Sequence, residues 1–171
     1  MKKVMLLGIN SKFVHTNIAI RYIKKYVEKY SDIEIEIFEK TINNHVEEII
    51  ADIYRKKPEI LMISAYIWNS EYVYKLITEV KKVFKNLTLV LGGPEVSYNA
   101  IELMNKYNEI DYIISGEGEK TTLEFLTKDK KDVKGLYYRE EDKIKFGGIR
   151  EGICDLDEIP FPYEVEEFSE K

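Results

Sequence analysis

The sequence predicts an α/β protein built on a doubly wound parallel sheet. Short apolar runs alternate with longer amphipathic stretches, and this alternation is typical of β-α-β units joined by right-handed crossovers. The 171 residues suffice for one such sheet, because a chain of this length hides roughly 70% of its unfolded surface on folding. With 44% hydrophobic and 33% charged residues, the composition is that of an ordinary globular protein.

Five apolar segments predict the strands of this sheet. Residues 4–7 and 60–63 are continuous apolar runs, as expected of strands that are buried on both faces. Residues 33–38 alternate strictly between apolar and polar types, which predicts a strand near a sheet edge with one face in water. Residues 87–91 and 110–114 are followed by glycines, which favour turns at strand ends.

The stretches between these strands carry apolar residues at three- and four-residue spacing, as one face of a helix requires. The first helix begins after Thr16, a favourable N-cap residue, and the second ends before Pro58. Three more begin near Asn69, Ala100 and Leu123. Five strands that alternate with five helices favour a flavodoxin-like or Rossmann-like sheet of order 2-1-3-4-5, with its switch point between the first and third strands.

The pattern changes after residue 130. Residues 136–138 and 143–146 flank the polar segment 139–142 and predict a β-hairpin. The tail 154–171 contains two prolines and seven acidic residues, which is typical of a linker. We therefore divide the chain into a Rossmann-like domain over residues 1–130 and a hairpin with an acidic linker over residues 131–171.

Charge and cysteine content disfavour several functions. Lys and Arg number 26 against 31 Asp and Glu, and the net charge of −5 disfavours nucleic-acid binding. The single Cys154 cannot form an internal disulfide, a two-cysteine zinc site or an iron–sulfur cluster held by this chain alone. The apolar run 4–9 is too short for a signal peptide or a membrane span, so we expect a cytoplasmic protein.

Ligands of open parallel sheets bind beyond the carboxyl ends of the strands. The loops expected there span residues 10–15, 64–69, 92–98 and 115–119, and they contain four of the nine glycines. Glycine lets a ligand approach the backbone closely, but turns also need glycine, so each single glycine keeps both interpretations.

Three common ligand classes fit these loops poorly. After the first strand, Gly8 is not followed by the further glycines of a dinucleotide-binding motif. The side chains of residues 11–15 are too bulky for the phosphate loop of an FMN site. A response-regulator receiver needs acidic residues after the first and third strands, where this sequence has Asn10 and Ser64.

The histidine and the tryptophan of these loops each have two interpretations. His15 precedes the first helix at its positive end, which favours the neutral imidazole. It either binds a metal or a ligand, or it packs under the start of the helix. Trp68 either covers the sheet or forms an apolar platform for a large flat cofactor.

Four segments at the strand ends carry a resemblance when they are taken together. They are residues 10–16 (NSKFVHT), 64–69 (SAYIWN), 91–95 (LGGPE) and 111–119 (DYIISGEGE). In this order they resemble the N-terminal cobalamin-binding domain of B12-dependent radical SAM proteins. The segment 155–163 (DLDEIPFPY) resembles the bridge that leads, in this family, to the radical SAM barrel.

The resemblance implies that the chain binds cobalamin at the carboxyl ends of the strands and serves an enzyme of methyl transfer or related radical chemistry. The [4Fe–4S] cluster and S-adenosylmethionine would belong to a barrel domain in cis, because the CxxxCxxC signature is absent here. The implied partners are cobalamin and that barrel, without nucleic acid or membrane, and no residue of this chain is assigned to catalysis or to a metal. The implied cofactor-binding residues are Asn10, Ser11, Lys12, His15, Ser64, Tyr66, Trp68, Asn69, Gly92, Gly93, Pro94, Glu95, Gly116, Glu117 and Gly118.

One departure concerns the axial ligand of cobalt. Other cobalamin domains carry Asp-x-His-x-x-Gly after the first strand, and Lys12 stands at the place of that histidine. A charged lysine is a hydrogen-bond donor and not a ligand, so we expect base-off binding without a protein histidine on cobalt and with Trp68 covering its lower face. The alternative function is a flavodoxin-like module without a cofactor that binds a partner protein.

Overall fold

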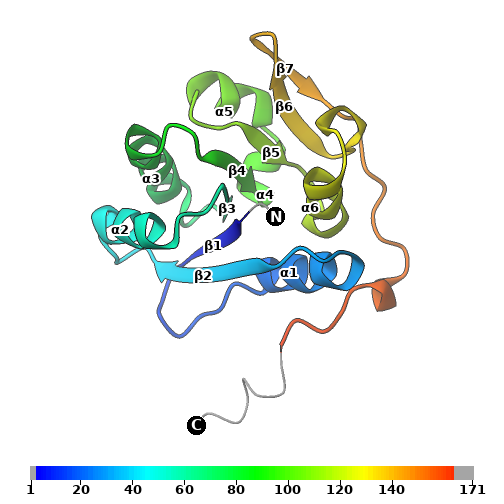
Figure 1. Ribbon diagram of the computed structural model, residues 1–171, viewed down its shortest axis with the longest axis horizontal. Helices are drawn as coiled ribbons and strands as arrows, with labels where there is room; N and C mark the ends of the chain where they lie inside the picture. The colour runs from blue at the N-terminus through cyan, green and yellow to red at the C-terminus, as the bar shows by residue number, and fades with distance from the viewer. Residues whose placement is uncertain (1–2, 164–171) are drawn as a thin grey trace.

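One sheet of seven strands organises the protein (Figure 1). The structure, a computed structural model, describes residues 3–163. In chain order the strands are β1 (Val4–Asn10), β2 (Ile35–Thr41), β3 (Ile60–Ser64), β4 (Thr88–Gly92), β5 (Tyr112–Ile114), β6 (Leu136–Glu140) and β7 (Lys143–Phe146). Their order across the sheet is β2-β1-β3-β4-β5-β6-β7, with the first five parallel and the last two antiparallel.

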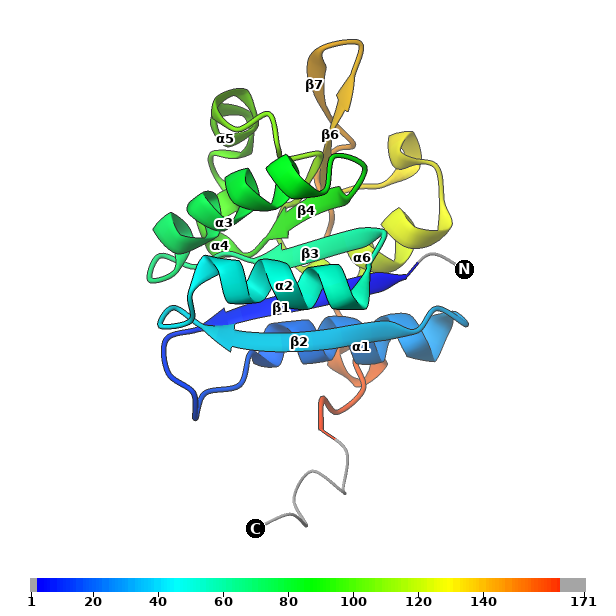
Figure 2. The same ribbon diagram turned by 60° about the vertical axis from the view of Figure 1, so that its left-hand side comes forward.

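Helices cover both faces of this sheet, as Figures 1 and 2 show. The helices are α1 (Ile18–Tyr30), α2 (Val46–Lys56), α3 (Ser70–Val83), α4 (Pro94–Ser97), α5 (Ala100–Lys106) and α6 (Gly118–Thr127), with short 3-10 turns η1 (Lys130–Asp132) and η2 (Leu156–Glu158). Successive strand residues point to opposite faces. Met5 and Leu7 therefore pack with α2, α3 and α5, while Val4 and Leu6 pack with α1 and α6.

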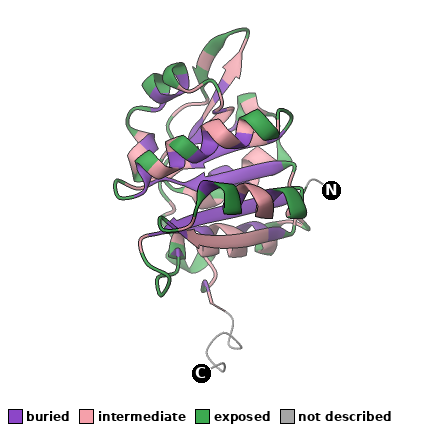
Figure 3. Ribbon diagram, turned by 90° about the vertical axis from the view of Figure 1, so that its left-hand side faces the viewer, coloured by how far each residue is buried: buried purple, intermediate pink, exposed green. Residues whose placement is uncertain are grey.

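The buried side chains lie mainly along the strands, which are purple in the centre of Figure 3 between helices with exposed outer sides. The α/β class and the mostly parallel sheet are thus confirmed. The expected count of five strands is wrong, because the C-terminal hairpin continues the sheet as β6 and β7 instead of standing apart from it. The sheet order therefore extends beyond 2-1-3-4-5 to all seven strands.

Burial explains why the hairpin joins the sheet. β6 pairs antiparallel with β5, so that Leu136 lies opposite Ile114 and Tyr138 opposite Tyr112. Leu136 and Tyr138 are buried in the core that α1 and α6 cover. Leaving these two side chains in water would forfeit the free energy of burying them. The division of the chain at residue 130 stays a prediction.

Residues 147–163, which the sequence predicts as a linker in part, lie along α6 and α1 (Figure 1). Arg150 forms an ion pair with Glu124 of α6. The side chains of Lys29 and Tyr30 both donate to the carbonyl oxygen of Glu158, at 3.0 and 3.3 Å. Further along, Tyr163 hydrogen-bonds Thr16, so the segment runs from the end of α1 back to its start. No helix among residues 3–163 is long and apolar enough to cross a membrane.

We expect Leu136→Ala to lower the free energy of unfolding by about 2–4 kcal/mol, because it leaves a cavity in a fully buried part of the core. Urea unfolding followed by circular dichroism measures this change. The matched control is Ile144→Ala on the neighbouring strand β7, whose side chain is only partly buried and whose loss costs less. Equal costs for the two variants would mean that the hairpin is peripheral to the fold.

Candidate cofactor-binding site

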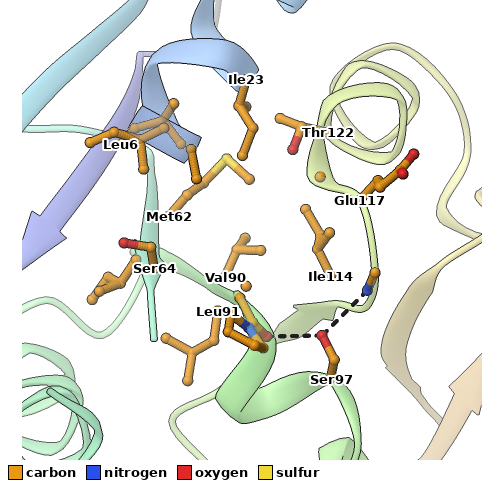
Figure 4. Close-up of a pocket in the computed structure, with 18 of the residues that line it drawn as sticks. Leu6, Ile23, Met62, Ser64, Val90, Leu91, Ser97, Ile114, Glu117 and Thr122 are labelled. Atoms are coloured by element: carbon orange, nitrogen blue, oxygen red, sulfur yellow. Dashed lines mark hydrogen bonds between the residues drawn. The ribbon is translucent and has the colours of Figure 1, made fainter. Parts of the chain in front are cut away.

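A pocket of about 360 Å³ lies between the sheet and the helices α1 and α6 (Figure 4). Each of the central strands turns every second side chain toward this face. These side chains are apolar, and they form the floor of the pocket. Its mouth opens at the carboxyl ends of β3, β4 and β5. The floor consists of Leu6, Met62, Val90 and Ile114, and the helical walls of Ala19, Ile20, Ile23 and Thr122.

A network of hydrogen bonds fixes the β1–α1 loop beside this mouth. Glu39 of β2 accepts from Asn10 Nδ2 at 2.9 Å and from the backbone N–H of Asn17 at 2.6 Å, and it pairs with Arg21 at 3.2 Å. Asn17 caps α1 and donates through Nδ2 to Ser64 Oγ at 2.6 Å. The network therefore ties the end of β1 and the start of α1 to β2 and β3.

The same loop brings three predicted residues together. Asn10 Nδ2 also donates to the carbonyl oxygen of His15 at 2.7 Å, and Ser11 Oγ lies 3.0 Å from His15 Nδ1. Lys12 and His15 are exposed at the outer part of the loop. Neither residue lines the pocket.

The β3–α3 loop presents an aromatic pair beside the mouth. Tyr66 stacks on Trp68 with ring centroids 4.3 Å apart and an interplanar angle of 12°. Asn69 is buried, and its side-chain amide is used in hydrogen bonds within the protein. It accepts from the backbone N–H of Tyr66 at 2.8 Å and donates to the carbonyl oxygen of Ile9 at 2.9 Å. Asn69 therefore positions Tyr66, which lines the pocket.

The two adjacent glycines after β4 have different roles. Gly93 has φ +106°, and a Cβ there would lie 2.5 Å from the carbonyl oxygen of Ala65, so the backbone itself requires glycine. A Cβ on Gly92 would meet only Ile114, at an ordinary 3.8 Å. The fold therefore does not require glycine at position 92. The missing side chain of Gly92 instead leaves room in the mouth of the pocket.

The start of α6 forms the opposite side of the mouth. A Cβ on Gly118 would lie 2.8 Å from Ile23 Cδ1, so glycine here permits the close approach of α6 to α1. Glu117 accepts a hydrogen bond from the backbone N–H of Ile153 at 2.8 Å. Burial raises the pKa of Glu119 above its ordinary value of 4.5, and the charge of Glu117 raises it further, while backbone N–H groups at the helix start oppose the shift.

The pocket lining includes eight of the fifteen predicted binding residues. The seven that do not line it are Asn10, Ser11, Lys12, His15, Trp68, Asn69 and Glu95. Sequence reasoning missed Ser97, Glu119 and Thr122, which also line it. Ser97 Oγ donates to the carbonyl oxygen of Gly93 at 2.8 Å, and it follows the Gly-Gly-Pro motif closely enough for that motif to signal it. The eight residues are Ser64, Tyr66, Gly92, Gly93, Pro94, Gly116, Glu117 and Gly118.

Large apolar side chains stand in water around this mouth. Phe13 and Tyr98 are 94% and 95% exposed, and Val14, Ile67 and Trp68 are exposed as well. Apolar side chains gathered around a pocket are typical of a surface that binds a large ligand or another protein.

Comparison with known protein families shows which family this chain belongs to. Residues 4–126 match the family model of the B12 binding domain. The chain belongs to the B12-binding domain family. Cobalamin is thus the cofactor that this family binds, and among residues 3–163 no group of three His, Cys, Asp or Glu side chains is placed to hold a metal ion directly.

Relatives and solved structures extend the comparison. The chain is 28% identical over 155 residues to the uncharacterized methyltransferase PH0819 of Pyrococcus horikoshii, covering 85% of this chain and 32% of that protein. It is 28% identical over 113 residues to the cobalamin-dependent radical SAM methyltransferase TokK of Streptomyces tokunonensis, covering 63% of this chain and 17% of that protein. The chain therefore spans a third or less of the length of these relatives.

The fold is shared with a solved radical SAM enzyme. The structure of the cobalamin-dependent S-adenosylmethionine radical enzyme OxsB, with aqua-cobalamin and S-adenosylmethionine bound, has a TM-score of 0.78 at 17% identity. The match covers 95% of this chain and 24% of that one. The structure of TsrM from Kitasatospora setae, a radical S-adenosylmethionine methyltransferase, has a TM-score of 0.72 at 18% identity, over 86% of this chain and 30% of that one.

The residues of this B12-binding domain fit the cofactor of its family. Cobalamin combines a broad corrin ring with a nucleotide tail that ends in a flat heterocyclic base. The apolar pocket offers a slot for a flat group, and the exposed apolar rim offers a surface for a broad one. The buried hydroxyl of Thr122 has no hydrogen-bond partner within residues 3–163, although it lines the slot. An orphaned hydroxyl in an apolar pocket indicates a ligand with a polar atom there.

We expect Glu119→Gln to raise the free energy of unfolding at pH 7. The raised pKa means that ionised Glu119 destabilises the fold; this cost is present above the raised pKa and disappears as the pH falls through it toward 4.5. Urea unfolding at several pH values measures the gain, which shrinks as the pH falls through that window. Glu102→Gln, an exposed residue in the first turn of α5, is the control and shows no such gain. A gain that is the same at every pH would contradict this prediction.

Proposed function

We propose that the domain holds cobalamin with the corrin over the carboxyl ends of β1, β3 and β4 and with the nucleotide tail in the pocket between α1, α6 and the sheet. One observation carries this proposal: an apolar slot leads inward from the loops that the sequence selects. The membership in the B12-binding family supports it.

Different residues around the mouth contact different parts of the cofactor in this proposal. Ser64 accepts from Asn17, and its own proton has no acceptor among residues 3–163, so it is available to an oxygen of the tail. Gly92 leaves space for the tail to pass. Tyr66 and Trp68 present a stacked aromatic surface to the ring. These side chains bind and orient the cofactor and exclude water from its lower face.

We further propose that the domain is the cofactor-binding part of a radical SAM enzyme that performs methyl transfer or a related radical reaction. Bound cobalamin supplies a cobalt centre that carries a methyl group or an electron. The relative TokK, which is named as a cobalamin-dependent radical SAM methyltransferase, supports this assignment. The [4Fe–4S] cluster and S-adenosylmethionine then belong to a barrel domain in cis, because this sequence has a single cysteine.

Cobalamin binding is tested by titrating the 171-residue chain with hydroxocobalamin and following its visible spectrum. We expect a saturable shift for the wild type and an affinity at least ten-fold lower for Gly92→Val, because its side chain fills the mouth of the pocket while its Cβ stays 3.8 Å from the atoms of Ile114. Thr88→Val, at the other end of β4, is the matched control and binds normally. The absence of a spectral shift in the wild type would favour the cofactor-free interaction module instead.

The axial position is tested by electron paramagnetic resonance of bound cob(II)alamin. Ser11 lies within hydrogen-bond distance of His15, and both His15 and Lys12 are exposed and outside the pocket lining, so we expect a spectrum without nitrogen superhyperfine splitting. We also expect Trp68→Ala to change the spectrum, because Trp68 covers the lower face in this proposal. Nitrogen splitting that disappears in His15→Ala would show a histidine ligand and refute the proposal of an uncoordinated lower face.

A further inference from the structure

Thr122 has the one buried hydroxyl among residues 3–163 that makes no hydrogen bond. A threonine in a helix can donate to the carbonyl oxygen four residues earlier. Thr78 and Thr127 do so, at 3.1 and 2.7 Å. The neighbouring Thr121 accepts from Arg150 and donates to Lys134. Thr122 neither donates to the carbonyl oxygen of the preceding turn nor bonds another segment as Thr121 does. A buried hydroxyl without a partner lowers stability.

The position of this hydroxyl indicates what it serves. Thr122 projects from α6 into the pocket, near Ile23 of α1 and Ile114 of β5 (Figure 4). Ser97 and Glu117 also line the pocket, but Ser97 donates to Gly93 and Glu117 accepts from Ile153. Ser64 keeps a free proton but is already held as an acceptor by Asn17, whereas Thr122 makes no hydrogen bond within residues 3–163. Thr122 therefore adds an unused donor to the apolar inner part of the slot.

A flat heterocycle with one acceptor atom is complementary to this arrangement. The apolar floor and walls would contact its faces, while the hydroxyl would reach an atom at its edge. The base of the cobalamin tail carries one ring nitrogen whose lone pair is free whenever it does not bind cobalt. A hydroxyl can donate to such a nitrogen.

We propose that Thr122 donates a hydrogen bond to this free ring nitrogen and so selects cobamides by the base at the end of their tail. The inference rests on the proposed function, because it needs the tail to enter the pocket. A site built to hydrogen-bond a ligand rejects an analogue that lacks the matching atom, since the buried group then stays unpaired. A phenolic base has no ring nitrogen. A purine base adds polar atoms that Leu6, Met62 and Val90 of the floor cannot satisfy.

The test compares three ligands with the wild type, Thr122→Val and Thr122→Ser. Hydroxocobalamin carries the ring nitrogen, a phenolyl cobamide has a base without it, and cobinamide lacks the nucleotide altogether. We expect Thr122→Val to weaken hydroxocobalamin binding about ten-fold, as the loss of one buried hydrogen bond does. Binding of the phenolyl cobamide and of cobinamide stays unchanged. Thr122→Ser keeps the hydroxyl and binds hydroxocobalamin within about three-fold of the wild type.

The outcomes separate this inference from the function on which it rests. Equal affinity of Thr122→Val and the wild type for hydroxocobalamin would overturn it, and so would an equal loss for all three ligands, which would reflect altered packing. The wild type alone gives a second measurement that needs no variant: equal affinity for hydroxocobalamin and the phenolyl cobamide would also overturn it. A wild type that binds cobinamide as tightly as hydroxocobalamin would instead remove the tail from the pocket, and with it both the proposed function and this inference.

Discussion

The carboxylate of Glu39 holds the arrangement on which the pocket depends. It accepts hydrogen bonds from the end of β1 and from the start of α1, and it pairs with Arg21 one turn further along that helix. These bonds set where α1 begins above the sheet. Gly118 then lets α6 pack against Ile23 of α1, and the space left between the two helices and the strands is the pocket. A displaced α1 would change the walls and the mouth together.

The C-terminal segment depends on the same helix. Lys29 and Tyr30 near the end of α1 hold the carbonyl of Glu158, and Thr16 before its start hydrogen-bonds Tyr163 at 3.1 Å. Residue 163 therefore lies at the same edge of the sheet as the mouth of the pocket. In the proposed enzyme this geometry places the connection to a barrel domain beside the cofactor rather than at the far end of the strands.

Local sequence patterns predict those parts of the fold that local physics determines. Apolar runs mark the buried strands, and the 3.6-residue period marks the helices, because burial acts on each segment separately. The pairing of β6 with β5 is a contact between distant segments, and no pattern within 136–146 distinguishes it from an isolated hairpin. The site shows the same limit. The sequence does not distinguish Gly92 from Gly93. In the structure, Ala65 leaves no space for a side chain at Gly93, whereas Gly92 faces free space in the pocket.

Electrostatics give the proposed tail a direction of entry. The N-terminus of a helix attracts anions when no acidic side chain lies beside it. At the start of α6, however, both Glu117 and Glu119 line the pocket. The phosphodiester of a nucleotide tail carries a negative charge, and two carboxylates on that side of the mouth repel it. Ser64 and Gly92 on the β3–β4 side offer a hydroxyl and free space without a charge. In the proposed complex the tail therefore enters along β3 and β4, and its uncharged base alone would reach across the slot to Thr122 on α6.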